Sequence, residues 1–401
     1  MVWLKRLGII VFSLLLVVTV VGALRAPVWT VEVAQDIAAP VSAIHEELVD
    51  FRRWKTWAGW DADVDPDAEY TYTGKTRGQG SAWSWKGPVM GQGRMMMTKA
   101  DPAQGVWFDE AIESDEFNAR GSITHTDLGD GTTRVVWRDE GRLPSIIGGL
   151  VSPFVVSALE KHFAAALVRL KERVETRELR YARLPQTQVH GSVHALISER
   201  DWSTKVDLSE LSIVRTIGVG MLKDLRGYVT FVEGGAWLAE AMDGRIADRV
   251  TAEPTGEAAM MVVAKVDRWR ASAISKEVPF DQIGAQISAR ISQVGLPTDR
   301  PIPFRLRGDI VNAVWHVVDG DRIDETMKTA AEIKRTGHLQ TRSRVKADIV
   351  GFYAPKQGGV ITEHGQAVRA HIVVPIERVS GHLDSGMIQP MSVLLLPDIS
   401  E

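Results

Sequence analysis

Two histidines near the C-terminus, His371 and His382, have the residue type and spacing of metal ligands. They lie in alternating apolar sequence that predicts a strand, a tight turn at Ile376-Glu377 and a second strand. This register places His371 directly opposite His382, with Cβ atoms roughly 5 Å apart, so that both imidazoles can reach one cation. Arg369 lies two residues before His371 and shares its face. A cation site does not normally hold a permanent positive charge at such a position.

Composition limits the function classes. At 401 residues the chain is long enough for about two domains. The net charge of -4, with Lys and Arg spread along the chain, argues against a nucleic-acid partner. The absence of cysteine excludes disulfides, thiolate metal ligands and cysteine nucleophiles. We therefore expect small molecules or proteins as partners.

Residues 1–27 are expected to be a membrane anchor or signal segment. Leu7 to Leu24 form an apolar run that follows Lys5 and Arg6 and reaches the length of a membrane-spanning helix. The competing interpretation is a signal peptide cleaved after the small residues Val21-Gly22-Ala23. Positive charge before the run predicts a single-pass protein of the cell membrane with its bulk extracytoplasmic, and periplasmic in a Gram-negative cell.

Residues 28–178 show the pattern of one α+β domain. Thr30 to Ile37 alternate as a strand, Ala39-Pro40 open a helix, and short strand candidates separated by turn signals follow. The segment after Pro153 predicts a long helix with one apolar face, formed by Val156, Leu159, Phe163, Leu167, Leu170 and Val174. A charged stretch with a proline, residues 179–188, is the expected linker.

The segments "DIAAPVSAIHEELVDFRRWKTWAGW" and "VVSALEKHFAAALVRLKERVE" resemble the START-like superfamily of polyketide cyclases and lipid carriers. This resemblance implies a helix-grip fold around an apolar cavity and an apolar small-molecule ligand. Trp54, Trp57 and His162 are the candidate ligand-binding residues of that cavity. The alternative is core packing for the two tryptophans and a helix-surface position for His162.

Residues 189–401 read as a mostly β domain of glycine-punctuated strands. The segments "VHGSVHALISERDWSTKVDLSELSIVRTIGVGMLKDLRGYVTFVEGGAWLAE" and "PIPFRLRGDIVNAVWHVVDG" resemble bacterial acetolactate decarboxylases. Those enzymes are carboxy-lyases that convert 2-acetolactate to acetoin and carbon dioxide. Their zinc is held by three histidines beside a glutamate and an arginine. The resemblance places His371 and His382 on two zinc ligands and Arg305 on the arginine.

The match is incomplete, because Arg369 falls on the remaining histidine ligand and Tyr228 falls on the glutamate. Two imidazoles alone make a weak zinc site, and a guanidinium beside them repels a cation. Glu363 or His364 is a possible replacement ligand. We expect no metal to be retained, with zinc as the alternative.

Simpler structural roles compete for each residue. Arg369 is opposite Asp384 in the predicted register and can form a cross-strand ion pair with it. Arg305 can form an exposed pair with Arg307 instead of a substrate clamp. Tyr228 is a strand aromatic or a proton donor, and His371 and His382 can be ordinary sheet histidines. Another group of histidines matches no ligand and is expected to be structural or exposed: His190, His194, His316 and His338.

The leading hypothesis is a membrane-anchored extracytoplasmic protein that binds small molecules. In it, Arg369 and Arg305 converge with the two histidines to bind a small carboxylate or hydroxy-keto acid without a metal. An active, metal-dependent acetolactate decarboxylase is the first alternative. A scaffold for protein interactions in the cell envelope is the second.

Overall fold

The computed structural model describes residues 28–60, 64–113, 118–143 and 145–400. The predicted anchor or signal segment, residues 1–27, lies outside the described residues. The chain divides into two compact units, Met1–Leu179 and Arg180–Glu401. Strand predominates, at 46% against 22% helix. The described part of the chain is thus mostly β, with a START-like domain in its first unit.

Among the described residues, one helical stretch, Val151–Tyr181, is apolar and long enough to cross a membrane by length and composition alone. Several of its residues are buried against the sheet of the first unit. An N-terminal membrane-spanning helix therefore stays a prediction.

The first unit is built on one antiparallel sheet with the strand order β1-β7-β6-β5-β4-β3-β2. Its strands are β1 (Val28–Ile37), β2 (Glu69–Gly74), β3 (Ser81–Gly87), β4 (Gly91–Asp101), β5 (Gly105–Ile112), β6 (Ala119–Asp127) and β7 (Thr133–Arg142). Two short helices, α2 (Val41–Leu48) and α3 (Phe51–Trp54), connect β1 to β2, and α4 (Ser145–Tyr181) follows β7. The predicted strand, helix and long helix are confirmed, although α4 begins before Pro153.

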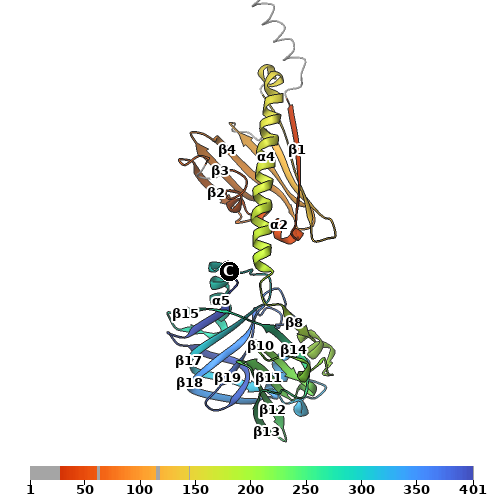
Figure 1. The fold of residues 1–401 in the computed structure, drawn as a ribbon, viewed down its shortest axis with the longest axis vertical. Coiled ribbons are helices and arrows are strands. Elements are labelled where there is room, and N and C mark those ends of the chain that lie inside the picture. Colours follow the sequence, from red (N-terminus) through yellow and green to blue (C-terminus); the bar gives the residue numbers. More distant parts are fainter. Residues whose placement is uncertain (1–27, 61–63, 114–117, 144, 401) are drawn as a thin grey trace, which may run out of the picture. The chain divides into compact units, whose positions relative to one another are not determined.

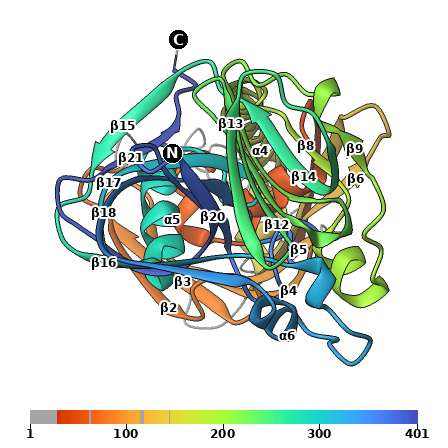
Figure 2. The same cartoon turned by 90° about the horizontal axis from the view of Figure 1, so that it is seen from below.

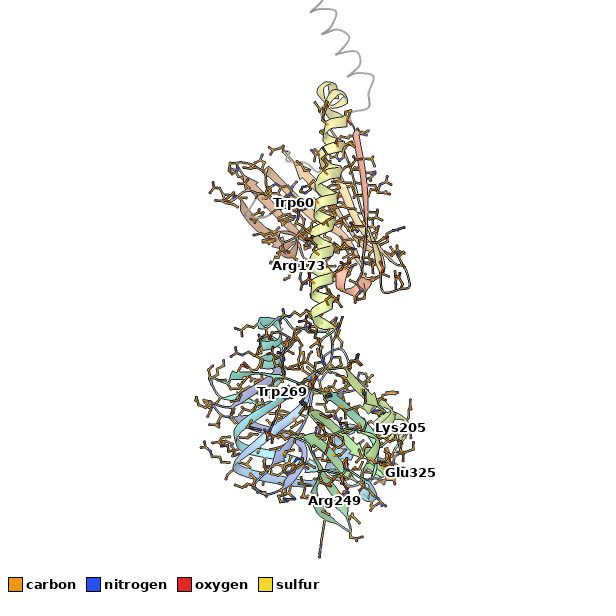
Figure 3. All side chains as sticks on the ribbon, viewed as in Figure 1. Trp60, Arg173, Lys205, Arg249, Trp269 and Glu325 are labelled. Carbon is orange, nitrogen blue, oxygen red and sulfur yellow. The ribbon has the colours of Figure 1, made fainter. Side chains whose placement is uncertain are left out.

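Helix α4 lies along the sheet of this unit (Figure 1). Its predicted apolar face is largely confirmed, because Phe163, Leu167, Leu170 and Val174 are buried in the core. Aromatic rings fill much of the space between helix and sheet. Trp60, labelled in Figure 3, contacts the ring of a histidine on α4 at a centroid distance of 5.7 Å.

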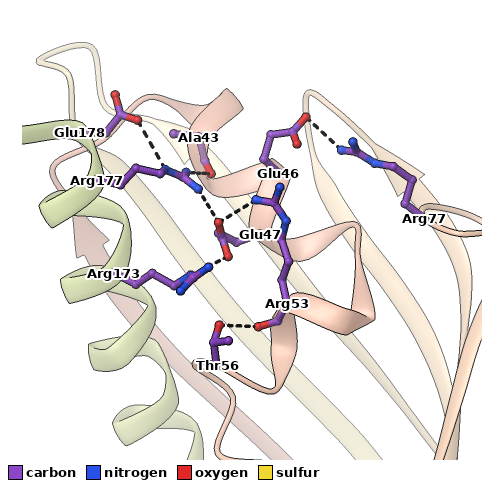
Figure 4. A network of polar contacts seen from close by, with 9 residues as sticks. All are labelled: Ala43, Glu46, Glu47, Arg53, Thr56, Arg77, Arg173, Arg177 and Glu178. Carbon is purple, nitrogen blue, oxygen red and sulfur yellow. Dashed lines mark hydrogen bonds and ion pairs between the residues drawn. The ribbon is translucent and has the colours of Figure 1, made fainter. Parts of the chain in front are cut away.

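A buried carboxylate attaches α2 to α4. The side chain of Glu47 is fully buried and forms ion pairs with Arg53 and Arg173 at 2.9 Å and with Arg177. Arg177 also donates to the backbone carbonyl of Ala43 (Figure 4). A buried charge is costly unless it is paired. These ion pairs therefore hold α2 in one position against α4.

The second unit has two sheets, of which the first has the strand order β13-β12-β11-β10-β14-β8. Its strands are β8 (Thr187–His190), β10 (Thr216–Leu222), β11 (Gly227–Val232), β12 (Gly235–Met242), β13 (Arg245–Thr251) and β14 (Glu257–Lys265), with the short β9 (Val206–Asp207) beside β14. Strands β10, β11 and β14 carry buried residues on both faces, so this sheet is covered on both sides.

The other sheet has the order β15-β21-β17-β18-β19-β20-β16. Its strands are β15 (Trp269–Ala273), β16 (Val278–Pro279), β17 (Ile302–Val317), β18 (His338–Tyr353), β19 (Val368–Val374), β20 (Val379–Ile388) and β21 (Val393–Pro397). Strand β17 also pairs with β20, which closes β17, β18, β19 and β20 on one another. Helix α5 (Ile283–Gln293) packs inside this curve (Figure 2).

Side chains alternate between two cores on the closed strands. One set, with Phe304, Ile349 and Ile372, packs with α5. The other set, with Val350, Phe352 and Val373, packs against residues of β10, β11 and β14. Strand alternation therefore sends every second side chain of β18 and β19 into the space between the two sheets.

Candidate functional site between the two sheets of the second unit

The predicted histidine pair forms as expected. The turn covers residues 375–378, and His371 on β19 is directly opposite His382 on β20, so the predicted register is confirmed. The closing pairing of β17 then places His316 opposite His382 on the other side of β20. Ring centroids are 5.6 Å apart for His371 and His382, and 5.3 Å apart for His316 and His382.

Strand β11 of the facing sheet supplies two polar side chains to these histidines. The hydroxyl oxygen of Tyr228 is 2.9 Å from Nε2 of His316, and Oγ1 of Thr230 is 2.8 Å from Nδ1 of His371. Tyr228 and Thr230 reach the same space because they are two residues apart on one strand. All four residues are buried. The hydroxyl groups of one sheet thus hold the imidazoles of the other.

The chain of contacts continues from His316 to a carboxylate and a lysine. Nδ1 of His316 is 2.9 Å from Oδ1 of Asp384, and the ammonium of Lys334 is 2.6 Å from the same oxygen. Lys334 belongs to α6 (Ala330–Arg335). Asp384 is the extra residue of a β-bulge, since β20 advances from Leu383 to Ser385 while β17 advances by one residue. Such bulges redirect side chains beside functional sites.

Arg369 is buried at this site without a partner. Its side chain comes from β19, only 7% of its surface is exposed, and it forms no hydrogen bond or ion pair with any described residue. Burial is the main cause that lowers the pKa of its guanidinium, and Tyr228 and Glu363 oppose that shift. A guanidinium remains protonated in proteins, so this site holds a positive charge without a direct ion pair.

A cavity of about 240 Å³ opens beside this charge. One part of its wall is polar and contains Tyr228, His316, Lys334, Glu363, Arg369 and His382. The remainder is mainly apolar and contains Val193, Leu196, Ile197, Met221, Leu225 and Ile333. The volume is below the roughly 300–1,000 Å³ of pockets for drug-sized ligands. It suits a metabolite of a few carbon atoms with one anionic end and one aliphatic end.

Both predicted ligand histidines are held in the neutral form. Burial is the main cause that moves the pKa of His371 well below its ordinary value, followed by the nearby charge of Arg369. Burial also lowers the pKa of His382, with His316 and Arg369 adding to the effect. Arg369 is therefore the principal unbalanced charge that these side chains surround.

The donor atoms at this site do not fit a catalytic zinc ion. Nε2 of His371 and Nδ1 of His382 are buried without hydrogen-bond partners, which gives two candidate donors. Both nitrogens of His316 are already engaged, and a catalytic zinc requires three protein ligands. Within the described residues, no three histidine or carboxylate side chains are grouped to hold a metal. Arg369 brings a cationic group to the position of the missing ligand.

The two candidate replacement ligands have different positions. Glu363 lies at the wall of the cavity. His364 lies against the loop at Gly358 and Gly359 and is not among the lining residues. Only Glu363 is therefore placed to act on a molecule in this cavity.

Arg305 does not converge with Arg369, and this part of the predicted pocket is wrong. Its guanidinium donates two hydrogen bonds to Asp348 at 2.9 Å and forms an ion pair with Glu233 at 2.7 Å. Arg307 contacts the same two carboxylates. Arg305 is buried, so it is neither an exposed residue nor free to clamp a substrate. Asp348 of the same sheet binds the guanidinium that was predicted to bind a carboxylate ligand.

The alternative ion pair between Arg369 and Asp384 is also wrong. The pairing of β19 with β20 ends at His371, and Arg369 is paired in register with Phe352 of β18 instead. Asp384 contacts His316 and Lys334. The closure of β17 onto β20, which the local sequence does not reveal, separates the two residues.

In the first unit, Trp54 and Trp57 are core residues. Both are fully buried and in ring contact with Trp137 at 5.9 Å, which rules out a position at a ligand mouth. His162 points into the same aromatic cluster, and burial lowers its pKa. Two prominent hollows over the described part of this unit are lined by other residues, on β1, β4, β5, β6 and β7.

Sequence reasoning did not assign four residues to the site: Thr230, His316, Lys334 and Asp384. His316 was expected to be structural or exposed, but it lies at the wall of the cavity. His316 is more than fifty residues from His371 and His382 in the sequence. The only feature that assigns it to the site is its position on the inward face of β17. That face becomes inward only when β17 closes onto β20.

Comparison with known proteins assigns a class to the first unit. Residues 28–175 match the family described as polyketide cyclase / dehydrase and lipid transport, which confirms the START-like resemblance of that segment. No curated protein matches the chain.

Solved structures similar to the chain include α-acetolactate decarboxylase from Bacillus subtilis strain 168, with 15% identity, 53% of this chain and 86% of that chain covered, and a TM-score of 0.43. A protein of unknown function similar to α-acetolactate decarboxylase, from Staphylococcus aureus, has 14% identity and a TM-score of 0.42. The match covers 53% of this chain and 84% of that chain. The Aha1 dimer from Colwellia psychrerythraea has 18% identity and a TM-score of 0.28. The match covers 36% of this chain and 96% of that chain. Scores of this size do not establish a shared activity.

Proposed function

We propose that the second unit binds a small aliphatic carboxylate without a metal ion. The observation that carries this proposal is Arg369, a buried guanidinium at the wall of a 240 Å³ cavity that forms no hydrogen bond or ion pair with a described residue. An unpaired buried charge is strongly unfavourable, whereas a carboxylate can accept two parallel hydrogen bonds from a guanidinium. A bound carboxylate would remove the imbalance.

The rest of the cavity supports an aliphatic body for this ligand. The apolar part of the wall, including Leu196, Met221 and Ile333, can cover a branched chain of a few carbon atoms. His371 and His382 are neutral and so add no second positive charge, which favours a single carboxylate. The hydroxy-keto acids implied by the acetolactate decarboxylase resemblance belong to this class.

Calorimetric titration of the purified chain with 3-methylbutanoate tests the proposal. We expect binding by the native chain and a loss of roughly tenfold to a hundredfold in affinity in Arg369→Gln, since a hydrogen-bonded charge is removed. Arg344→Gln is the matched control, because Arg344 is exposed on β18 and pairs with Asp309. Equal affinity in Arg369→Gln and the native chain would contradict the proposal.

Metal analysis, paired with an assay for acetoin formation from 2-acetolactate, tests the alternative of an active decarboxylase. The buried, unpartnered nitrogens of His371 and His382 are the observation in favour of that alternative. Stoichiometric zinc together with acetoin formation that is lost in His371→Ala would establish the enzyme and overturn the metal-free proposal. We expect neither zinc nor acetoin.

For the first unit we propose an apolar ligand, supported by the match to a family described by lipid transport. The segment from Trp29 to Trp137 contains eight tryptophans, these two included, so quenching of tryptophan fluorescence by an apolar ligand is a suitable measurement. The absence of quenching by fatty acids and by polyketide-like aromatics would leave this unit as a scaffold.

The membrane anchor is a proposal based on sequence. The apolar run from Leu7 to Leu24 supports attachment of an extracytoplasmic chain to the cell membrane. Retention in the membrane fraction after alkaline extraction, with the second unit accessible to protease from outside, is the expected result. Recovery of the chain in the cytoplasm would contradict it.

A further inference from the structure

The carboxylate of Glu363 lines the same cavity as the guanidinium of Arg369. Glu363 is exposed and Arg369 is buried, so the negative charge lies nearer to solvent and the positive charge lies deeper. The two groups do not form an ion pair, and the side chain of Glu363 has no hydrogen bond with another described residue. The wall of one cavity thus holds two separate charges of opposite sign.

The backbone that carries Glu363 is held in place, although its side chain is exposed. The neighbouring Thr362 is buried, and its hydroxyl donates to the carbonyl oxygen of Gln366 at 2.9 Å. In the same loop, the carbonyl oxygen of Val360 accepts from the backbone N–H of Val193 at 3.0 Å. Because Val193 belongs to the apolar wall, this bond ties the loop of Glu363 to the cavity.

We infer that the cavity binds a small α-amino acid with a branched aliphatic side chain, whose carboxylate contacts Arg369 and whose ammonium group contacts Glu363. The inference rests on the proposed binding of a carboxylate by Arg369 and adds a second charge to the ligand. The two charged groups of an amino acid share one carbon atom, so it can pair with a guanidinium and a carboxylate at once. Its side chain then faces the apolar wall, which includes Leu196 and Ile333.

Glu363 acts on the two kinds of acid in opposite ways. A simple carboxylate bound to Arg369 is repelled by Glu363, whereas the ammonium group of an amino acid is attracted to it. Lys334, another cation of the wall, does not cancel this attraction, because its ammonium is 2.6 Å from the carboxylate of Asp384. His382 adds no positive charge, because burial lowers its pKa.

Three related molecules test the inference by calorimetry on the purified full chain: valine, 3-methylbutanoate and 2-methylpropylamine. The second lacks the ammonium group of valine, and the third lacks its carboxylate. We expect valine to bind about fivefold more tightly than 3-methylbutanoate, which is the gain from one ion pair with an exposed carboxylate. The amine should bind more weakly than both acids, because it meets Arg369 without a carboxylate.

Glu363→Gln should change the two acids in opposite directions. Valine should lose about fivefold in affinity, and 3-methylbutanoate should gain affinity because the repelling charge is removed. Glu363→Lys should enlarge both changes. A structural disturbance would weaken both acids, so the opposite signs identify a direct effect of charge. Glu325→Gln is the matched control, because Glu325, labelled in Figure 3, is exposed and outside the cavity wall.

The outcomes separate this inference from the proposed function. Equal affinities for valine and 3-methylbutanoate in the native chain, or a valine preference that survives Glu363→Gln, would overturn the inference alone. Failure of both acids to bind would overturn the proposed function and this inference with it. A valine preference that is lost in Glu363→Gln and kept in Glu325→Gln would support the inference.

Discussion

Arg369 and Arg305 show how differently two buried arginines of one sheet can be used. Arg305 is matched by Asp348 and Glu233, so its charge is compensated within the protein. Arg369 has no such match and adjoins a cavity instead. A buried charge without a partner lowers stability, and residues that do so are commonly retained for function.

Arg369→Met is therefore expected to stabilise the second unit. The substitution keeps an unbranched apolar stem and removes the uncompensated charge, with an expected gain of about 1–3 kcal/mol in the free energy of unfolding. Urea denaturation without ligand measures it. Arg305→Met is the contrasting variant, with an expected loss of about 3 kcal/mol because it leaves Asp348 only partly paired. A loss of stability in Arg369→Met would show that its charge is compensated after all.

Two carboxyl groups in the first unit also lack sufficient partners. Glu110 on β5 and Asp139 on β7 are buried, and each has one oxygen without a hydrogen bond. Burial raises the pKa of Asp139 to about 7. Burial, followed by the neighbouring Asp139, raises the pKa of Glu110 well above its ordinary value.

Asp139→Asn should stabilise the first unit in a pH-dependent way. Between the ordinary aspartate pKa of about 3.9 and the folded value, the unfolded chain has released a proton that the folded chain retains. The folded state binds more protons, so native stability falls as the pH rises through this range and levels off above it. The gain in Asp139→Asn should thus grow from pH 4 to pH 7. Glu140→Gln is the control, because the pKa of Glu140 is lowered and its effect has the opposite sign.

At the scale of the element, β17 is the strand that assembles the site. It pairs with β18 along its whole length and with β20 near its end, which brings His316 to His382. A glycine permits the close approach of these strands, since a Cβ at Gly381 would lie 2.6 Å from Cδ1 of the buried Trp315. The predicted hairpin of β19 and β20 needed only local sequence, whereas the β17 pairing joins residues more than sixty positions apart.

The attachment of α2 to α4 gives a prediction for the first unit. Glu47→Gln leaves Arg173 and Arg177 without their carboxylate, and we expect a loss of about 3 kcal/mol in the free energy of unfolding. Glu46→Gln is the matched control, since Glu46 is a partly exposed neighbour paired with Arg77, and its change should stay within about 0.5 kcal/mol. An equal loss of unfolding free energy in the two variants would show that the burial of Glu47 does not strengthen its ion pairs.

At the scale of the whole molecule, each compact unit has its own hydrophobic core. Thermal unfolding is therefore expected to show two transitions. Glu47→Gln should lower one of them, Arg369→Met should raise the other, and the double variant should show both shifts unchanged. Calorimetry of the four proteins measures this. A single transition that moves with both substitutions would contradict it.

The sequence by itself determined the strand and helix pattern of the START-like segment, the long apolar helix face and the hairpin that places His371 opposite His382. These features depend on periodicity and short-range pairing, which neighbouring residues encode. Only the tertiary structure decided that Arg305 is neutralised by Asp348, that Trp54 and Trp57 fill the core, and that His316 joins the site. Those outcomes depend on which strands close on one another, because burial and charge pairing are properties of residues brought together from distant parts of the chain.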